Sequence, residues 1–211
     1  MQIAVITGPT YEVALTRILL ANKLRDGVEL RLDLFRDFDI EKIEKLLKAS
    51  QGKTIFTLRK RTSGGGFIGS EERRLDLLAK LFALQPDYID LEFDTNTEFL
   101  ASCAVEYPKT KIITSYHNFE KTPKDLDLVL QRMLTPHSYA YKICTTANAS
   151  SDSYKILRFV QKQVGKGFRM IGLALGEYGR ITRKEGIKSG NYLNYTVLHN
   201  HDSCAPGIQF A

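Results

Sequence analysis

Short apolar runs alternate with longer amphipathic segments along the whole chain. The runs have the length and residue types of strands, and the segments between them carry apolar residues at helical spacing. Alternation of this kind favours an α/β fold with a parallel sheet. Strands are predicted at 2–8, 27–34, 53–59, 88–93, 111–117, 138–147, 168–176 and 192–199, and helices at 11–24, 39–49, 71–84, 97–107, 122–133 and 153–164.

The number of predicted strands, eight, favours a (β/α)8 TIM barrel over a doubly wound open sheet, which is the alternative. The sequence contains no linker and no low-complexity segment, so residues 1–211 are predicted to form a single domain. Residues 201–211 are too few for a closing helix. We therefore expect the eighth helix to be absent or truncated in this sequence.

Five of the predicted strands have one apolar face and one face that is polar, charged or small. Strands of a parallel sheet are covered on both sides and usually read as almost entirely apolar. In a barrel, the apolar faces would pack under the helices and the other faces would converge inside. The residues of those inward faces are Glu29, Arg31 and Asp33; Thr57 and Arg59; Asp90 and Glu92; Ser115 and His117; and Gly172, Ala174 and Gly176.

Lys142 occupies the centre of the run at 138–147. A lone lysine in a strand usually extends to water from a sheet edge. Here it shares a face with small residues such as Ala140, and four other strands supply charged or polar inward faces. An interior lysine either pairs with a carboxylate or acts as an amine nucleophile that forms a Schiff base with a carbonyl substrate. The nearby Glu29, Asp90 and Glu92 leave its protonation state open.

Three further residues have side chains suited to chemistry in this pocket. His117 has an ordinary pKa of about 6.5, which suits proton transfer near neutral pH. Arg59 and Arg183 are candidates for binding an anionic substrate through paired hydrogen bonds, although Arg183 taken alone resembles a surface residue. Arg59, His117 and Lys142 lie in the later parts of their strands, the end at which barrel active sites form.

Composition narrows the classes of function. The formal charge of +6 admits a nucleic acid or an anionic small molecule as a partner, but no aromatic-interleaved basic stripe is present. No apolar stretch is long enough to span a bilayer, and the N-terminus lacks the features of a signal peptide. Three widely spaced cysteines favour a reducing, cytoplasmic setting, and no cysteine or histidine cluster indicates a metal site.

Seven short motifs, in order along nearly the whole chain, resemble those of the type I 3-dehydroquinate dehydratases. The resemblance is most specific in the histidine segment and in the strand lysine that follows it. The motifs are Glu29-Leu-Arg-Leu-Asp33; Thr57-Leu-Arg59 followed by Gly64-Gly65; Ile89-Asp-Leu-Glu92; Ser115-Tyr-His-Asn-Phe119 followed by Thr122-Pro123; Tyr141-Lys-Ile143; Thr182-Arg183; and Ala205-Pro-Gly207.

The resemblance implies a barrel enzyme, usually dimeric, that uses no metal and no organic cofactor. It implies the third step of the shikimate pathway, the dehydration of 3-dehydroquinate to 3-dehydroshikimate by syn elimination. Lys142 matches the Schiff-base lysine of the family. His117 matches the histidine that removes the C2 proton and assists imine formation and departure of the C1 hydroxyl. Arg183 matches the arginine that binds the substrate carboxylate, and Glu29, Arg31 and Arg59 match residues around the substrate hydroxyls and ring.

The sequence departs from the family pattern at two places. Ser63 stands where the family usually has a glutamate that hydrogen-bonds the catalytic histidine. In the C-terminal loop, counted from Ala-Pro-Gly, Cys204 and Ile208 replace a serine and a glutamine. Ser203 and Gln209 are therefore the candidates in that loop for contacting substrate.

The short C-terminal region also fits a chain that is fused to a shikimate dehydrogenase in a longer polypeptide, as in some members of the family. Two alternatives to the dehydratase are another lysine-imine barrel of the class I aldolase type and a basic nucleic-acid-binding domain. The histidine motif and the inward position of the charges favour the dehydratase over both.

Overall fold

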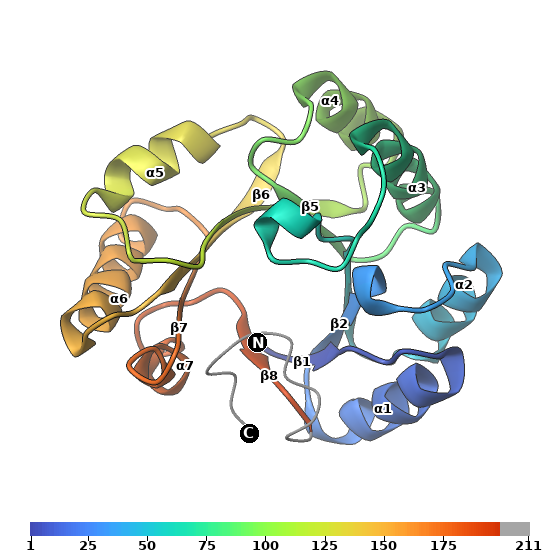
Figure 1. Cartoon of the computed structure of the whole chain (residues 1–211), viewed down its shortest axis with the longest axis horizontal. Helices are drawn as coiled ribbons and strands as arrows, with labels where there is room; N and C mark the ends of the chain where they lie inside the picture. The colour runs from blue at the N-terminus through green and yellow to red at the C-terminus, as the bar shows by residue number, and fades with distance from the viewer. Residues whose placement is uncertain (199–211) are drawn as a thin grey trace.

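The computed structural model describes residues 1–198, and these form one eight-stranded parallel sheet in the order β7-β6-β5-β4-β3-β2-β1-β8. Helices surround the strands, as Figure 1 shows in a view down the barrel. The predicted (β/α)8 barrel is confirmed, whereas the prediction about an eighth helix falls on residues 199–211, outside the described residues.

The strands are β1 (Gln2–Ile6), β2 (Gly27–Arg31), β3 (Lys53–Thr57), β4 (Tyr88–Glu92), β5 (Lys111–Asn118), β6 (Ser138–Thr146), β7 (Met170–Leu175) and β8 (Asn194–Thr196). The helices are α1 (Tyr11–Leu24), α2 (Ile40–Ala49), α3 (Glu71–Ala83), α4 (Thr97–Glu106), α5 (Leu126–Met133), α6 (Ser150–Val164) and α7 (Arg180–Glu185), with 3-10 turns η1 (Leu32–Leu34) and η2 (Arg61–Ser63).

Side-chain caps fix where several helices begin. Asp39 and Ser70 accept hydrogen bonds from backbone N–H groups in the first turns of α2 and α3, as residues of these types commonly do at helix N-termini. The start of α5 was predicted at Thr122, with a proline in the first turn, and this is wrong. Asp125 caps α5 by accepting from the Leu128 N–H at 2.9 Å, and the Thr122 hydroxyl instead bonds Thr145 at 2.8 Å.

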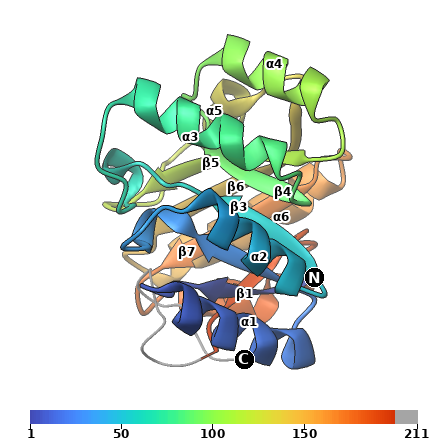
Figure 2. The ribbon, with the colours of Figure 1, turned by 90° about the vertical axis from the view of Figure 1, so that its right-hand side faces the viewer.

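The apolar core has an outer and an inner layer. Residues such as Leu30 and Phe56 fill the space between the strands and the helices, and α1 to α4 follow one another along the outside of the barrel (Figure 2). Residues such as Ile55, Ile113 and Ile171 fill the barrel interior. Burial of both layers provides most of the driving force for this fold. The charged inward positions of the strands lie beyond the inner layer, nearer the carboxyl ends of the strands.

The prediction for the inward face of β7 is wrong. A Cβ atom on Gly172 would lie 2.4 Å from the Val160 side chain of α6, so this glycine faces the helix layer. Leu173 and Leu175 face the interior instead and line the pocket described below. Gly172 therefore marks the close approach of α6 to β7, and this strand contributes an apolar wall to the interior.

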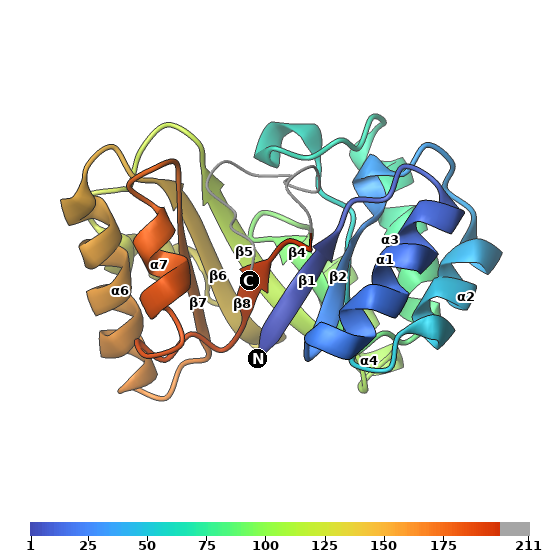
Figure 3. The same cartoon turned by 90° about the horizontal axis from the view of Figure 1, so that it is seen from below.

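β7 and β8 are the two ends of the described sheet order, and the residues just before β8 hydrogen-bond to β7. The Asn191 amide accepts from the Gly172 N–H at 2.8 Å and donates to the Gly172 carbonyl at 3.0 Å, so it satisfies backbone groups of β7. The Tyr192 N–H donates to the Met170 carbonyl at 2.8 Å. Figure 3 shows the barrel from the side, with the N-terminus at the end opposite the loop that contains η2.

Candidate active site

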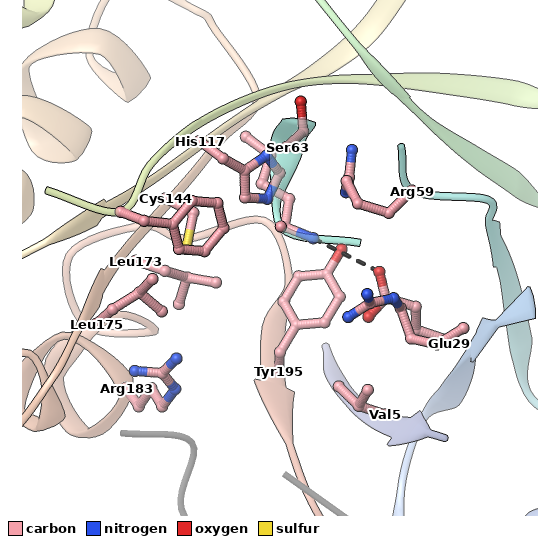
Figure 4. Close-up of a pocket in the computed structure, with 14 residues that line it drawn as sticks. Val5, Glu29, Arg59, Ser63, His117, Cys144, Leu173, Leu175, Arg183 and Tyr195 are labelled. Carbon is pink, nitrogen blue, oxygen red and sulfur yellow. Dashed lines mark hydrogen bonds and ion pairs between the residues drawn. The ribbon is translucent and has the colours of Figure 1, made fainter. Parts of the chain in front are cut away.

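A pocket opens at the end of the barrel where the strands carry their polar residues. It encloses about 540 Å³ of space, part of it open to solvent. Figure 4 shows side chains from opposite sides of the barrel pointing into it. Its lining includes all six predicted site residues that the structure describes: Glu29, Arg31, Arg59, His117, Lys142 and Arg183. The remaining two candidates, Ser203 and Gln209, lie outside the described residues.

Lys142 is buried inside the barrel and paired with carboxylates. Its side chain is 7 % exposed, and its Nζ atom lies 3.0 Å from Asp90 Oδ2 and 3.5 Å from Glu29 Oε1. Burial alone would lower the lysine pKa, but the two carboxylates outweigh burial and raise that pKa above its ordinary value. In the structure without substrate, Lys142 is therefore an ammonium group.

A chain of buried charges supports Asp90. Arg59 Nη2 lies 2.8 Å from Asp90 Oδ1, and Arg59 Nη1 donates to the Ser115 hydroxyl at 2.7 Å and lies 3.4 Å from Glu92. Arg74 of α3 lies 2.8 Å from the other Glu92 oxygen. Burial would raise the pKa of the Asp90 carboxyl, but Arg59 and Lys142 hold it well below its usual value. The network thus fixes Asp90 as the anionic partner of the lysine.

Arg74 is expected to stabilise the fold through this network, because its side chain is fully buried. Replacing Arg74 with methionine should lower the free energy of unfolding by about 3 kcal/mol, since Glu92 would lose one partner of a buried ion pair. The control is Arg73→Met, on the exposed side of the same helix, which should change stability by less than about 0.5 kcal/mol. Urea unfolding of both variants measures the difference, and equal effects would contradict the role assigned to Arg74.

His117 lies on β5, next to the lysine strand. In the β5–β6 register it is opposite Cys144, two positions beyond the Ser115–Lys142 pair, so the histidine and the lysine share the inward face. Burial and the positive charges of Arg59 and Lys142 lower the His117 pKa well below its ordinary value. The imidazole is therefore held in its neutral form.

The Nδ1 atom of His117 is buried and has no hydrogen-bond partner among the described residues. Ser63 lines the same pocket, but within residues 1–198 its side chain makes no hydrogen bond to the imidazole. The ring instead stacks on Phe119, with centroids 6.0 Å apart and planes 11° from parallel. Among the described residues, the imidazole thus has a ring contact with Phe119 and no hydrogen bond at Nδ1.

Backbone conformation and close packing both require glycine at position 64, directly after Ser63. Gly64 has a φ of 75°, in the left-handed region that favours glycine, and a Cβ atom there would lie 2.1 Å from the Phe119 ring. The glycine-rich loop can therefore lie directly against the ring that stacks on His117. Part of the glycine content of this loop reflects close packing at the pocket.

Two arginines complete the basic side of the pocket. Arg183 was predicted in a loop and lies on the short helix α7, where its Nη1 atom donates to the Ala174 carbonyl at 2.8 Å. Arg31 is held by Asp33 through contacts of 2.9 and 2.8 Å. Together with Arg59, these residues give the pocket a positive wall suited to an anionic substrate.

Two important residues were absent from the predicted site. Asp90 was noted as an inward charge, but its pairing with Lys142 depends on barrel closure. Tyr195 of β8 also lines the pocket, and the Lys142 Nζ atom lies 4.2 Å from the centroid of its ring. The alternation of Leu193, Tyr195 and Val197, which all lie in the inner layer, is the signal that identifies it.

Residues 1–198 lack two further features. No group of three or more histidine, cysteine, aspartate and glutamate side chains in this part of the chain is arranged to hold a metal ion. No helix in the same residues has the length and apolar character needed to cross a membrane.

Comparisons with known proteins identify relatives over most of the chain. The 3-dehydroquinate dehydratase of Methanocaldococcus jannaschii is 35 % identical over 189 residues, which cover 88 % of this chain and 82 % of that protein. The bifunctional chloroplastic 3-dehydroquinate dehydratase/shikimate dehydrogenase of Arabidopsis thaliana is 36 % identical over 187 residues. This match covers 86 % of this chain but only 30 % of the Arabidopsis protein.

Solved structures agree with the sequence comparison. The crystal structure of the 3-dehydroquinate dehydratase from Aquifex aeolicus matches with a TM-score of 0.79 and 30 % identity, covering 100 % of this chain and 94 % of that one. More distant barrels, such as an orotidine 5'-phosphate decarboxylase from Pyrococcus horikoshii with a TM-score of 0.64 and 11 % identity, share the fold alone. The family model for type I 3-dehydroquinase matches residues 3–210, and this chain belongs to the type I 3-dehydroquinase family.

Proposed function

We propose that Lys142 and His117 carry out the reaction of this family, the dehydration of 3-dehydroquinate to 3-dehydroshikimate in the shikimate pathway. The observation that carries the assignment of residues is a buried lysine, paired with Asp90 inside a barrel pocket, with a neutral histidine on the neighbouring strand. This constellation fits an amine nucleophile and a proton-transfer group.

Lys142 supplies the nucleophile in this proposal. Its amine attacks the substrate ketone, and loss of water gives a protonated imine. The imine is a stronger electron sink than the ketone, so it stabilises the enamine that forms when the C2 proton is removed. The enamine then expels the C1 hydroxyl, and hydrolysis of the imine releases the product and the lysine.

His117 accepts the proton that Lys142 must lose before it can attack. Lys142 is an ammonium group in the free protein, whereas an attacking amine must be neutral. His117 is neutral there and lies on the same inward face. One proton can pass from the lysine to the histidine without changing the total protonation of the pocket. His117 gives that proton to the oxygen that leaves as water when the imine forms. The neutral imidazole then serves as the base at C2, and the proton it takes there goes to the departing hydroxyl.

The positive wall of the pocket binds the substrate. Arg183 contacts the carboxylate, as its match to the family motif implies, and Glu29 and Arg31 contact the hydroxyls of the ring. Arg59 lies beside the ring and also holds Asp90 in place. The homodimer, the cytoplasmic location and fusion to a shikimate dehydrogenase stay predictions from the sequence.

Reductive trapping tests this function. The protein is incubated with 3-dehydroquinate and borohydride, and the adduct is located by peptide mass spectrometry while formation of the enone product is followed in a parallel sample. We expect the product in the untreated sample and an adduct on Lys142 in the treated one. Absence of both would refute the proposal, and an adduct on another lysine would refute the role of Lys142.

Ser63→Glu is expected to increase turnover if the histidine lacks an orienting partner. A carboxylate at this position can accept a hydrogen bond from His117 Nδ1 and raise the pKa of the imidazole. The acid limb of the kcat/KM profile should then move to higher pH. Ser63→Gln is the matched control, because it has similar size but no charge and should not produce the same shift. An unchanged or lower kcat in Ser63→Glu would show that orientation does not limit His117.

A further inference from the structure

Tyr195 places a hydroxyl group in the pocket that no part of the described protein satisfies. The residue lies on β8, is 2 % exposed and lines the pocket beside Lys142. Its Oη atom is buried and has no hydrogen-bond partner among residues 1–198. In Figure 4 the Tyr195 ring rises from β8 with its hydroxyl directed to the middle of the pocket, on the side of Glu29.

A second buried tyrosine in the same barrel has a hydrogen-bonded hydroxyl, in contrast to Tyr195. Tyr88 is equally buried, at 2 % exposed, and its hydroxyl lies 2.6 Å from the hydroxyl of Tyr192. A buried hydroxyl without a partner costs free energy, and native proteins rarely leave one. The hydroxyl of Tyr195 is therefore available to hydrogen-bond a ligand. Because the ring lies beside the Lys142 Nζ atom, the ligand atom that it contacts would lie close to that nitrogen.

Imine formation needs a proton donor at that position. The carbonyl oxygen attacked by the lysine must gain two protons before it leaves as water. His117 starts neutral, and burial and the charges of Arg59 and Lys142 disfavour its protonation. The Nδ1 atom of His117 receives no hydrogen bond from Ser63 or from any other described residue. A single histidine carries one transferable proton at a time, and its protonated form is disfavoured in this pocket, so a second group is needed to donate the other proton.

We propose that Tyr195 is a catalytic residue that hydrogen-bonds the carbonyl oxygen attacked by Lys142 and relays a proton to it, an inference that rests on the proposed function above. As the nitrogen lone pair forms the C–N bond, the C=O π pair moves to oxygen. That oxygen takes the proton of the Tyr195 hydroxyl, and Tyr195 takes one proton from the nitrogen.

The second proton comes from His117, which holds the proton that Lys142 lost before the attack. The C–O bond breaks, the oxygen leaves as water, and the nitrogen lone pair closes the C=N bond. Lys142 then carries a protonated imine, and both Tyr195 and His117 are neutral again. Protons and charge balance, so the step requires no further reactant.

The test is Tyr195→Phe, which removes only the hydroxyl. We expect kcat to fall about 100-fold, the size of effect seen when one donor to a developing oxyanion is lost. In a rapid-quench experiment with 3-dehydroquinate and borohydride, the rate at which the Lys142 adduct appears should fall in parallel. The melting temperature should stay the same or rise, because the variant removes an unsatisfied buried group.

Tyr88→Phe is the matched control. It removes the hydroxyl of an equally buried tyrosine, and this hydroxyl is hydrogen-bonded to Tyr192, outside the pocket lining. We expect its melting temperature to fall while kcat and the trapping rate stay within about twofold of the parent protein.

Two results for Tyr195→Phe would overturn the inference: a trapping rate equal to that of the parent protein, or a fall in kcat explained by a matching loss of folded protein. Failure of the parent protein to form any Lys142 adduct would instead refute the proposed function, so the two failures are distinguishable.

Discussion

Lys142→Ala is expected to lower kcat for 3-dehydroquinate by about 10⁴-fold or more, the scale of loss when a covalent nucleophile is removed. No other described residue of the pocket lining carries an amine, so the borohydride adduct should vanish with it. Turnover is measured by the appearance of the enone product, and adduct formation by intact mass.

The stability of Lys142→Ala separates a chemical loss from a structural one. Asp90 keeps Arg59 as a partner at 2.8 Å, and Glu29 keeps the Thr57 hydroxyl at 2.8 Å. The variant should therefore lose less than the about 3 to 5 kcal/mol typical when one partner of a buried pair is removed. Lys53→Ala, which breaks the exposed pair with Asp87, is the control and should retain full activity. A folded Lys142→Ala protein with more than about 1 % of parental kcat would contradict the assignment.

The sequence predicted the barrel and most of its inward face because both depend on local periodicity. Alternation along β2 to β5 placed Glu29, Arg59, Asp90 and His117 on the interior side, and the structure finds all four in or directly beside the pocket. The same rule failed for β7. Gly172 is small because α6 packs against it, and a residue without a sizeable side chain gives no indication in the sequence of which face of the strand it occupies.

Contacts between distant strands could not be predicted. Lys142 lies close to Asp90 and Glu29 because the closed barrel brings β2, β4 and β6 around one interior, and no local pattern encodes those distances. The stacking of Phe119 on His117, and its contact with Gly64, likewise depend on packing between loops. Tyr195 was missed for another reason: a tyrosine among apolar residues reads as core until its hydroxyl is found without a partner.

His117→Ala is expected to lower kcat by about 10³-fold, within the range for loss of a general acid–base group. The Lys142 adduct should still form, but more slowly, because the nucleophile remains and only its proton acceptor is lost. His137→Ala, at a histidine that does not line this pocket, is the control and should leave kcat unchanged. A trapped adduct without turnover would separate the role of the histidine from that of the lysine.

The pH profile gives an independent test of His117. Since its pKa is lowered by burial and by Arg59 and Lys142, the imidazole stays neutral as pH falls through its ordinary value of about 6.5. The parent kcat/KM should therefore hold through pH 6.5 and decline only at lower pH, where protonation removes the acceptor for the lysine proton.

The free energy of unfolding should also decrease as the pH falls. Below pH 6.5 the unfolded chain binds a proton at His117 that the folded protein does not, so the free energy of unfolding decreases as pH falls. In His117→Ala this contribution should disappear. An acid limb of kcat/KM centred at or above pH 6.5 would show that the pKa of His117 is not lowered in the free protein, and the protonation state assigned to the imidazole would then be wrong.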